Sequence, residues 1–110
     1  MNKEQMEQKV KAATFRVNNG QVLRTINILR EKYNQLEVVQ SVVEDNGVDV
    51  GEFIDSINFL SMEGYISLRK ISDHCNVDIS DANYKECEAK VTGKGIRLLA
   101  GGICDNMIEI

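Results

Sequence analysis

The chain has 110 residues, of which 43% are hydrophobic and 27% charged, with eight Gly and no Pro. This length predicts a single domain, residues 1–110, with a core that needs no disulfides, and the composition excludes collagen-like and Pro-rich segments. Because the apolar runs are only a few residues long, we expect no membrane span and no membrane partner. The N-terminus is too polar for a signal peptide, and three Cys without one predict reduced thiols and a cytoplasmic location.

The net charge of −4 is unevenly distributed along the chain. Residues 1–32 carry seven basic and three acidic side chains, residues 33–83 carry two and ten, and residues 84–110 carry four of each. A negative net charge opposes the binding of a polyanion such as DNA, and the middle of the chain forms an acidic block.

Apolar residues in the first segment are spaced by four, three and four: Met6, Val10, Ala13 and Val17. This spacing predicts an N-terminal helix over residues 1–18, with one apolar stripe. The stripe either packs against its own domain or forms a dimerisation arm, in which case Met6, Val10 and Val17 contact the second chain of a homodimer. The Asn18-Asn19-Gly20 sequence predicts a turn that ends this helix.

Three more helices are predicted before residue 65. The first has its apolar positions at Val22, Ile26, Leu29 and Tyr33, and the second at Leu36, Val39, Val42 and Val43. Asn46-Gly47 ends the second in a left-handed cap. Asp49 and Glu52 have the spacing of a capping box and open the third, which has an apolar face at Phe53, Ile54, Ile57, Leu60 and Met62 and ends at Gly64.

After Gly64 the hydrophobic period changes from 3.6 to 2, which predicts strands. Two alternating segments, residues 65–71 and 87–91, flank a polar loop and together predict a hairpin. We expect five side chains of this hairpin to line one face over the helices: Ile66, Leu68, Cys87, Ala89 and Val91.

Thr92 can cap a last helix, which Gly101-Gly102 ends. Its expected apolar face contains Ile96, Leu99 and Ala100. The tail over residues 101–110 is apolar for a chain end, so we expect it to pack on another surface. Its candidate partner residues are Ile103, Met107 and Ile108.

Two strings in this order of elements, FLSMEGYI at 59–66 and VTGKGIRLL at 91–99, resemble parts of winged helix-turn-helix domains. The first is similar to the end of a third core helix running into a wing strand. The second is similar to the T-x-x-G-x-x-x-L passage that leaves the wing in many bacterial regulators. The resemblance covers residues 21–100. It implies an α+β winged helix with a three-helix core, a two-stranded wing and a C-terminal helix, here with an added N-terminal helix.

The resemblance also implies a small non-enzymatic regulator of bacterial or phage type that binds DNA, often as a dimer. The helix near 49–63 would then occupy the recognition position, yet it carries four acids and no basic residue. Carboxylates close to phosphates oppose binding, because Lys and Arg supply most non-specific affinity. The candidate nucleic-acid residues are therefore Arg24, Arg30, Lys32, Ser56, Asn58, Arg69 and Lys70.

Two interpretations remain open at this point. DNA is held by a surface other than the acidic helix, drawn from the basic residues of the first 32 positions. Alternatively, the domain is a protein-interaction module whose acidic face binds a basic partner or imitates nucleic acid.

The sequence offers no convincing catalytic, metal or cofactor site. His74 is the single His, and the three Cys lack a close C-x-x-C pair, so we expect no bound metal. Gly93-Lys94-Gly95 does not complete a phosphate-binding loop. We therefore expect no enzyme activity and no cofactor.

Overall fold

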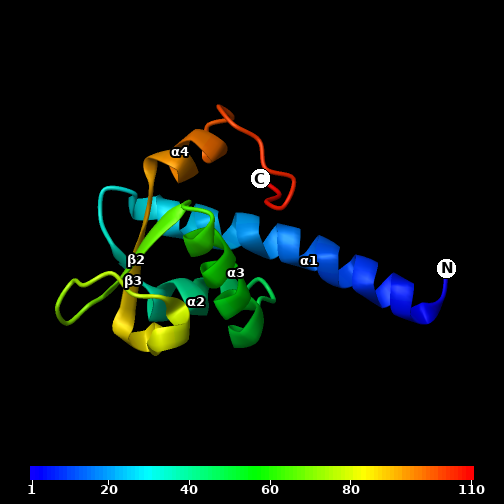
Figure 1. The fold of residues 1–110 in the computed structure, drawn as a ribbon, viewed down its shortest axis with the longest axis horizontal. Helices are drawn as coiled ribbons and strands as arrows, with labels where there is room; N and C mark the ends of the chain where they lie inside the picture. Colours follow the sequence, from blue (N-terminus) through cyan, green and yellow to red (C-terminus); the bar gives the residue numbers. More distant parts are fainter.

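The computed structural model describes residues 1–110 as an α+β fold of four α-helices and one three-stranded antiparallel sheet. In chain order the elements are α1 (Lys3–Ile26), β1 (Asn34–Gln35), α2 (Leu36–Glu44), α3 (Val50–Met62), β2 (Ile66–Lys70), β3 (Cys87–Val91) and α4 (Gly93–Leu99). The first three helices contact one another, and the sheet closes one end of this group with α4 beside it (Figure 1).

Helix α1 runs unbroken through the predicted turn, so the expectation that Asn18-Asn19-Gly20 ends a helix is wrong. All three residues are buried, and α1 crosses the boundary that we expected between an N-terminal arm and a core. The helix ends at Ile26 instead of continuing to Tyr33, and Leu29, expected on its apolar face, is 54% exposed. A 3₁₀ turn over Asn27–Leu29 leads from α1 towards β1.

The predicted ends of the other helices are confirmed, because short-range hydrogen bonds determine them. Asp49 and Glu52 form a reciprocal capping box at the start of α3. The hydroxyl of Thr92 accepts a hydrogen bond from the N–H of Gly95 and caps α4. Gly47 and Gly64 follow α2 and α3 with φ of +89° and +79°, a conformation that favours glycine.

The hairpin is confirmed, and its five expected inward side chains are all buried. Ile66 pairs with Val91 and Leu68 with Ala89, so both strands present their apolar side chains to the helices. The sequence interpretation missed β1, which pairs with β3 and gives the strand order β1-β3-β2. Met62 was placed on the apolar face of α3 but is 77% exposed.

The C-terminal tail folds back across α1, as Figure 1 shows near the middle of that helix. The N–H of Glu109 donates to the carbonyl of Arg16, and the Asn19 side-chain amide donates to the carbonyl of Met107 at 2.9 Å. Ile108 is buried in the core and Ile103 packs against it. The tail therefore packs within its own chain, which corrects the expectation that Ile103 and Ile108 contact a partner.

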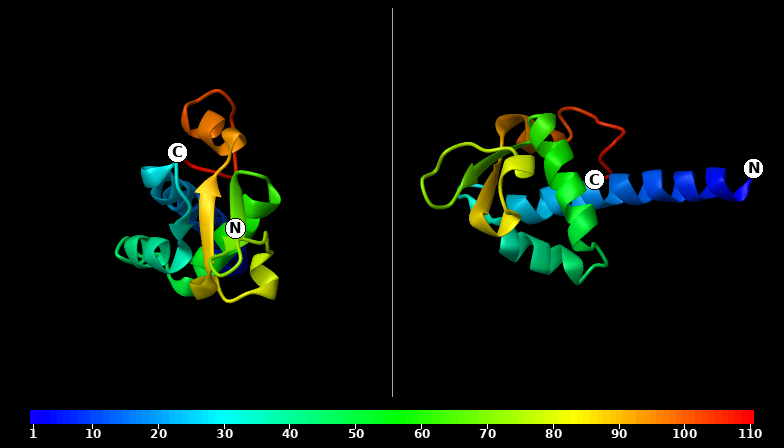
Figure 2. Two further views of the ribbon diagram at one scale, coloured as in Figure 1. Left: turned by 90° about the vertical axis from the view of Figure 1, so that its left-hand side faces the viewer. Right: turned by 60° about the horizontal axis from the view of Figure 1, so that its bottom comes forward.

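The first half of α1 projects from the body into solvent (Figure 2). Every residue from 1 to 13 is exposed, and the molecule extends 50 × 31 × 24 Å. Met6 and Val10 are 56% and 65% exposed, so the apolar stripe does not pack against its own domain over this length.

Candidate functional site

Helix α3 lies where the resemblance implies a recognition helix, but it presents few groups to a ligand. Ser56 is fully buried and its hydroxyl has no hydrogen-bond partner, so the expectation that it contacts a nucleic acid is wrong. Asn58 and Asp55 are exposed. On this exposed face of α3, the amide of Asn58 is the group that could contact a base, and the carboxylate of Asp55 lies one turn away.

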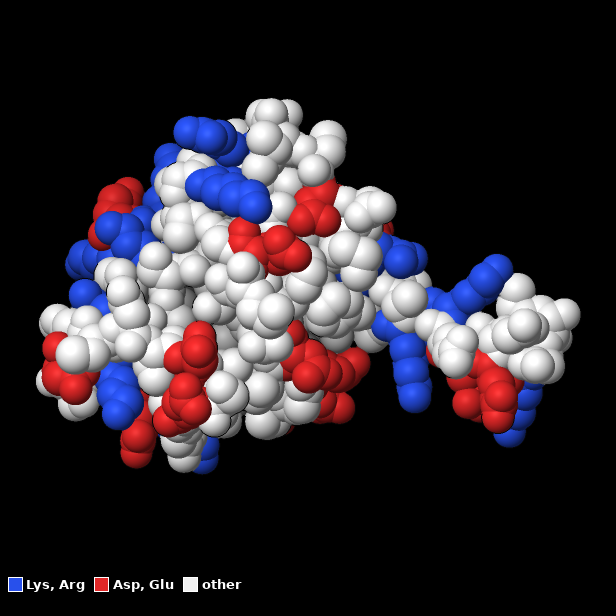
Figure 3. Space-filling model, in the orientation of Figure 1, with Lys and Arg blue, Asp and Glu red and all other residues white.

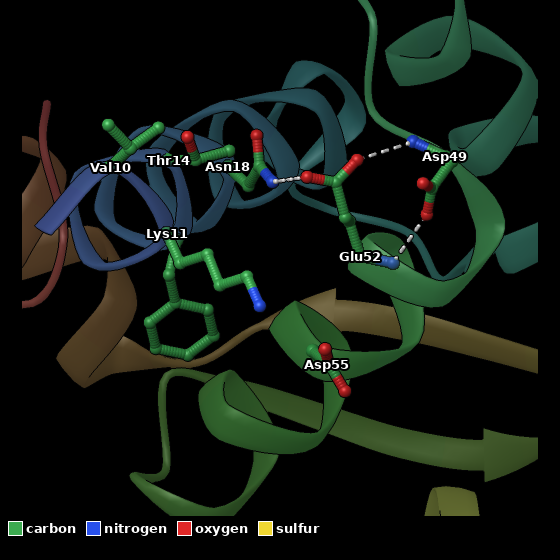
Figure 4. Close-up of a pocket in the computed structure, with 8 residues that line it drawn as sticks. Val10, Lys11, Thr14, Asn18, Asp49, Glu52 and Asp55 are labelled. Carbon is green, nitrogen blue, oxygen red and sulfur yellow. Dashed lines mark hydrogen bonds between the residues drawn. The ribbon is translucent and has the colours of Figure 1, made fainter. Parts of the chain in front are cut away.

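Carboxylates surround the start of α3, where they line a groove of about 510 Å³ against α1 (Figure 4). Glu52 accepts hydrogen bonds from the N–H of Asp49 at 3.1 Å and from the side-chain amide of Asn18 at 3.3 Å. Asp55 also lines the groove, and Lys11 is its one basic residue. This groove attracts cations and repels phosphate.

Arg69 already has partners within its own chain, Glu88 and Tyr33. Its Nε and Nη2 each lie 2.8 Å from Oε2 of Glu88, which is directly opposite on β3, and its guanidinium stacks 3.5 Å from the ring centroid of Tyr33. Glu88 is only 8% exposed. Because a half-buried ion pair is costly to separate, Arg69 is better placed to hold the sheet together than to bind a phosphate.

The other basic candidates come from separate parts of the fold. Arg24 is exposed on α1 and donates to the carbonyl of Glu109 at 3.3 Å. Arg30 and Lys32 are exposed in the turn between α1 and β1. Lys70 is half-buried at the end of β2, opposite Cys87.

The sequence interpretation missed three basic residues at the end of the sheet and on α4: Lys90, Lys94 and Arg97. Lys94 donates to the carbonyl of Glu63 at 2.8 Å and lies 4.7 Å from the ring centroid of Tyr65. Figure 3 shows several basic groups on the upper and left parts of the body, with some acidic groups beside them and further acidic groups on the lower part. A sequence signal existed, because residues 89–104 hold three basic and no acidic side chains. We call Arg30, Lys32, Lys90, Lys94 and Arg97 the basic end.

Metal-ligating residue types do not converge anywhere in the chain, since no three His, Cys, Asp or Glu side chains are grouped in a way that could hold an ion. His74, in the left-handed region at φ 60°, and Cys75 are exposed in the loop after β2. The N–H of Cys75 donates to Asp73 at 2.9 Å and lowers the pKa of that carboxyl. Burial raises the pKa of the Cys87 thiol, and nearby Glu86 adds to the effect, so Cys87 is a poor nucleophile.

The tail is anchored to the start of β2 by a second polar contact. The Tyr65 hydroxyl donates to Asp105 at 2.5 Å, and the same carboxylate accepts the N–H of Met107. Burial raises the pKa of Tyr65 to about 12, with further contributions from Asp105 and Glu63. Met107 is half-buried here, with its carbonyl bound to Asn19, so it too is engaged within the chain.

None of the four helices combines the length and the apolar character that crossing a bilayer requires. Comparison with known proteins found no match to any family model, curated protein or solved structure.

Proposed function

We propose that this chain is a non-enzymatic binding module built as a winged helix, and that it acts as a small transcription-regulator-like protein. The order of elements supports this proposal. Three helices in mutual contact are followed by an antiparallel hairpin and a last helix, and the loop between β2 and β3 has the place of a wing. The strings at 59–66 and 91–99, which carry the resemblance, form the α3–β2 and β3–α4 junctions.

We further propose that duplex DNA is contacted through the basic end, and that α3 does not read bases. Two observations carry this proposal: carboxylates line the start of α3, and Lys94 and Arg97 on α4 are exposed, as are Arg30 and Lys32 in the turn before β1. Phosphate contacts by Lys and Arg give affinity without sequence information. The expected complex is weak and salt-sensitive, with a dissociation constant of about 10⁻⁴–10⁻⁶ M at physiological salt.

The test is a fluorescence titration with a labelled random-sequence duplex at two salt concentrations. Arg30→Gln with Lys32→Gln removes two charges from an exposed turn, so it should weaken binding without unfolding the chain. Each lost phosphate contact should also flatten the salt slope by about 0.9. Lys3→Gln with Lys85→Gln is the matched control, because it removes the same charge from exposed positions outside the basic end.

Equal weakening by the two double variants would show that the basic end is not the contact surface. No measurable binding at low salt would reject DNA as a ligand. A nanomolar complex with one sequence, lost on Asn58→Ala, would show instead that α3 reads bases despite its acids.

The acidic groove supports a second candidate function, contact with a basic protein segment. Asp49, Glu52 and Asp55 line one depression together with apolar atoms of Val10 and Phe15 on α1. Titration with a short arginine-rich peptide tests this candidate, and Asp55→Lys should abolish the binding. Binding that survives this reversal of charge would place the peptide elsewhere on the surface.

A further inference from the structure

Strand β2 lies at the edge of the sheet, because the strand order β1-β3-β2 gives it a neighbouring strand on one side alone. The N–H of Thr92 donates to the carbonyl of Tyr65, so the backbone groups of Tyr65 and of every second residue after it face β3. The residues between them have the opposite orientation. The N–H and C=O groups of Ile66, Leu68 and Lys70 therefore point away from β3, towards the edge.

The loop after β2 covers one part of this edge and then leaves it. The N–H of Val77 donates to the carbonyl of Leu68 at 3.2 Å, and the chain then turns away into a 3₁₀ turn over Ile79–Asp81. The N–H and C=O of Ile66 and the N–H of Leu68 are left without a hydrogen-bond partner in the chain. Both residues are buried, and unpaired backbone groups of buried residues are rare because they cost free energy.

A groove of about 480 Å³ lies beside these unpaired groups. It is lined by residues 66–68 of β2, by residues 76–78 and Asp81 of the loop, and by Ser61 of α3. Its charged side chains are those of Asp78 and Asp81, which are exposed, and no basic residue lines it. The groove shares no residue with the acidic groove between α1 and α3. It therefore offers a separate place where backbone hydrogen bonds and a positively charged ligand are favoured together.

We propose that this groove binds an extended, basic segment of another protein, which adds to the sheet as a short strand beside β2. An extended chain presents its N–H and C=O together on one side at every second residue, and this arrangement matches the two free groups of Ile66. A helix uses its backbone groups internally and cannot pair in this way. Lys or Arg side chains of the segment are attracted by Asp78 and Asp81. Val77 already lies opposite Leu68, so the added strand ends there.

Fluorescence anisotropy with the full chain at low salt tests the proposal, and the probe is a labelled heptapeptide of alternating Lys and Thr. A second peptide of the same sequence, methylated at every backbone nitrogen, keeps the charge but cannot donate to the carbonyl of Ile66. The methylated peptide should bind at least about tenfold more weakly. Equal affinities would show that side-chain charge alone makes the contact, and the proposal would be wrong.

Substitutions in the chain test where the unmethylated peptide binds. Asp78→Asn with Asp81→Asn should weaken its binding about threefold, since exposed charge pairs contribute modestly. Glu31→Gln with Asp45→Asn is the matched control, because it removes the same charge from exposed positions outside the groove. Asp55→Lys should have little effect, whereas loss of binding in that variant would place the peptide between α1 and α3. Either that loss or equal weakening by the two double variants would reject the groove beside β2 as the site.

Hydrogen exchange followed by NMR tests the backbone pairing residue by residue. The bound peptide should slow the exchange of the Ile66 amide at least about tenfold, because this N–H gains an acceptor. The Ser67 amide faces β3 opposite Lys90 and should keep its rate. An unchanged rate at Ile66, or a peptide that does not bind at low salt, would overturn the proposal whether or not the chain binds DNA.

Discussion

The carbonyl oxygen of Glu109 occupies the space where a side chain on residue 20 would begin, 1.7 Å from an ideal Cβ position. Residue 20 is a glycine inside a helix, where its flexibility normally costs stability. Here the missing side chain lets the C-terminal tail lie directly on α1. The adjacent Asn19 holds the carbonyl of Met107, so one turn of α1 forms the docking site for the tail.

Gly20→Ala should therefore destabilise the chain, although alanine is the better helix former. The new methyl group displaces the tail and loosens Ile108 in the core, at a cost of about 1–3 kcal/mol. Urea unfolding measures this loss. Gly93→Ala is the matched control, since a Cβ there has no heavy atom within 4 Å and should be neutral or stabilising. Equal effects at both positions would contradict the docking role of Gly20.

The Tyr65–Asp105 contact should make stability fall at high pH. The pKa of Tyr65 is about 12 in the folded chain against 10.0 for the free side chain, so folding favours its protonated form. Its contribution is complete below pH 10 and is lost as the pH rises towards 12. Tyr65→Phe should cost about 1 kcal/mol at pH 8, and this deficit should shrink by pH 11. A deficit that stays constant with pH would contradict this linkage.

The three thiols should differ in reactivity. Cys75 and Cys104 are exposed, whereas Cys87 is fully buried and burial raises its pKa. A thiol reagent such as DTNB should therefore modify two cysteines rapidly in the native chain and the third only after unfolding. Cys87→Ser should leave the rapid phase intact. Three rapid equivalents in the native chain would mean that β3 is not buried as described.

Substitutions on the exposed face of α3 should have little effect on DNA binding. Asn58→Ala removes the best candidate for base contact, and Asp55→Asn removes a repelling charge. If α3 faces away from the duplex, each should change the dissociation constant by less than about twofold, because screening weakens distant charges. Clearly tighter binding by Asp55→Asn would place α3 close to the phosphates.

Much of the fold could be predicted from the sequence, because helix caps and strand alternation depend on residues close together in the chain. The capping box of Asp49 and Glu52 and the cap at Thr92 depend on atoms within four residues of each other. The alternation that places Ile66 and Leu68 on one face depends only on strand geometry. The uncovered stripe was likewise visible as a spacing, though not which surface it would meet.

Contacts between distant segments decided the rest. Asn18-Asn19-Gly20 has the composition of a turn, but it stays helical because residues almost ninety positions later dock on it. The pairing of β1 with β3 involves two residues, too few to show a period. Ser56 and Asn58 are both polar, and only the packing of α3 buries Ser56 and leaves Asn58 exposed.

The sequence by itself determined where the helices α2, α3 and α4 begin and end, which faces of the hairpin are apolar, and that the predicted recognition helix is acidic. Each of these properties is fixed by neighbours along the chain or by composition. Only the tertiary structure decided that the tail docks on α1 at Asn19 and Gly20, that Met6 and Val10 stay exposed, and that Lys90, Lys94 and Arg97 join the turn before β1 in a basic end. These properties depend on which segments far apart in the chain pack together. The burial of apolar area that drives this packing is non-directional, so it leaves no local pattern in the sequence.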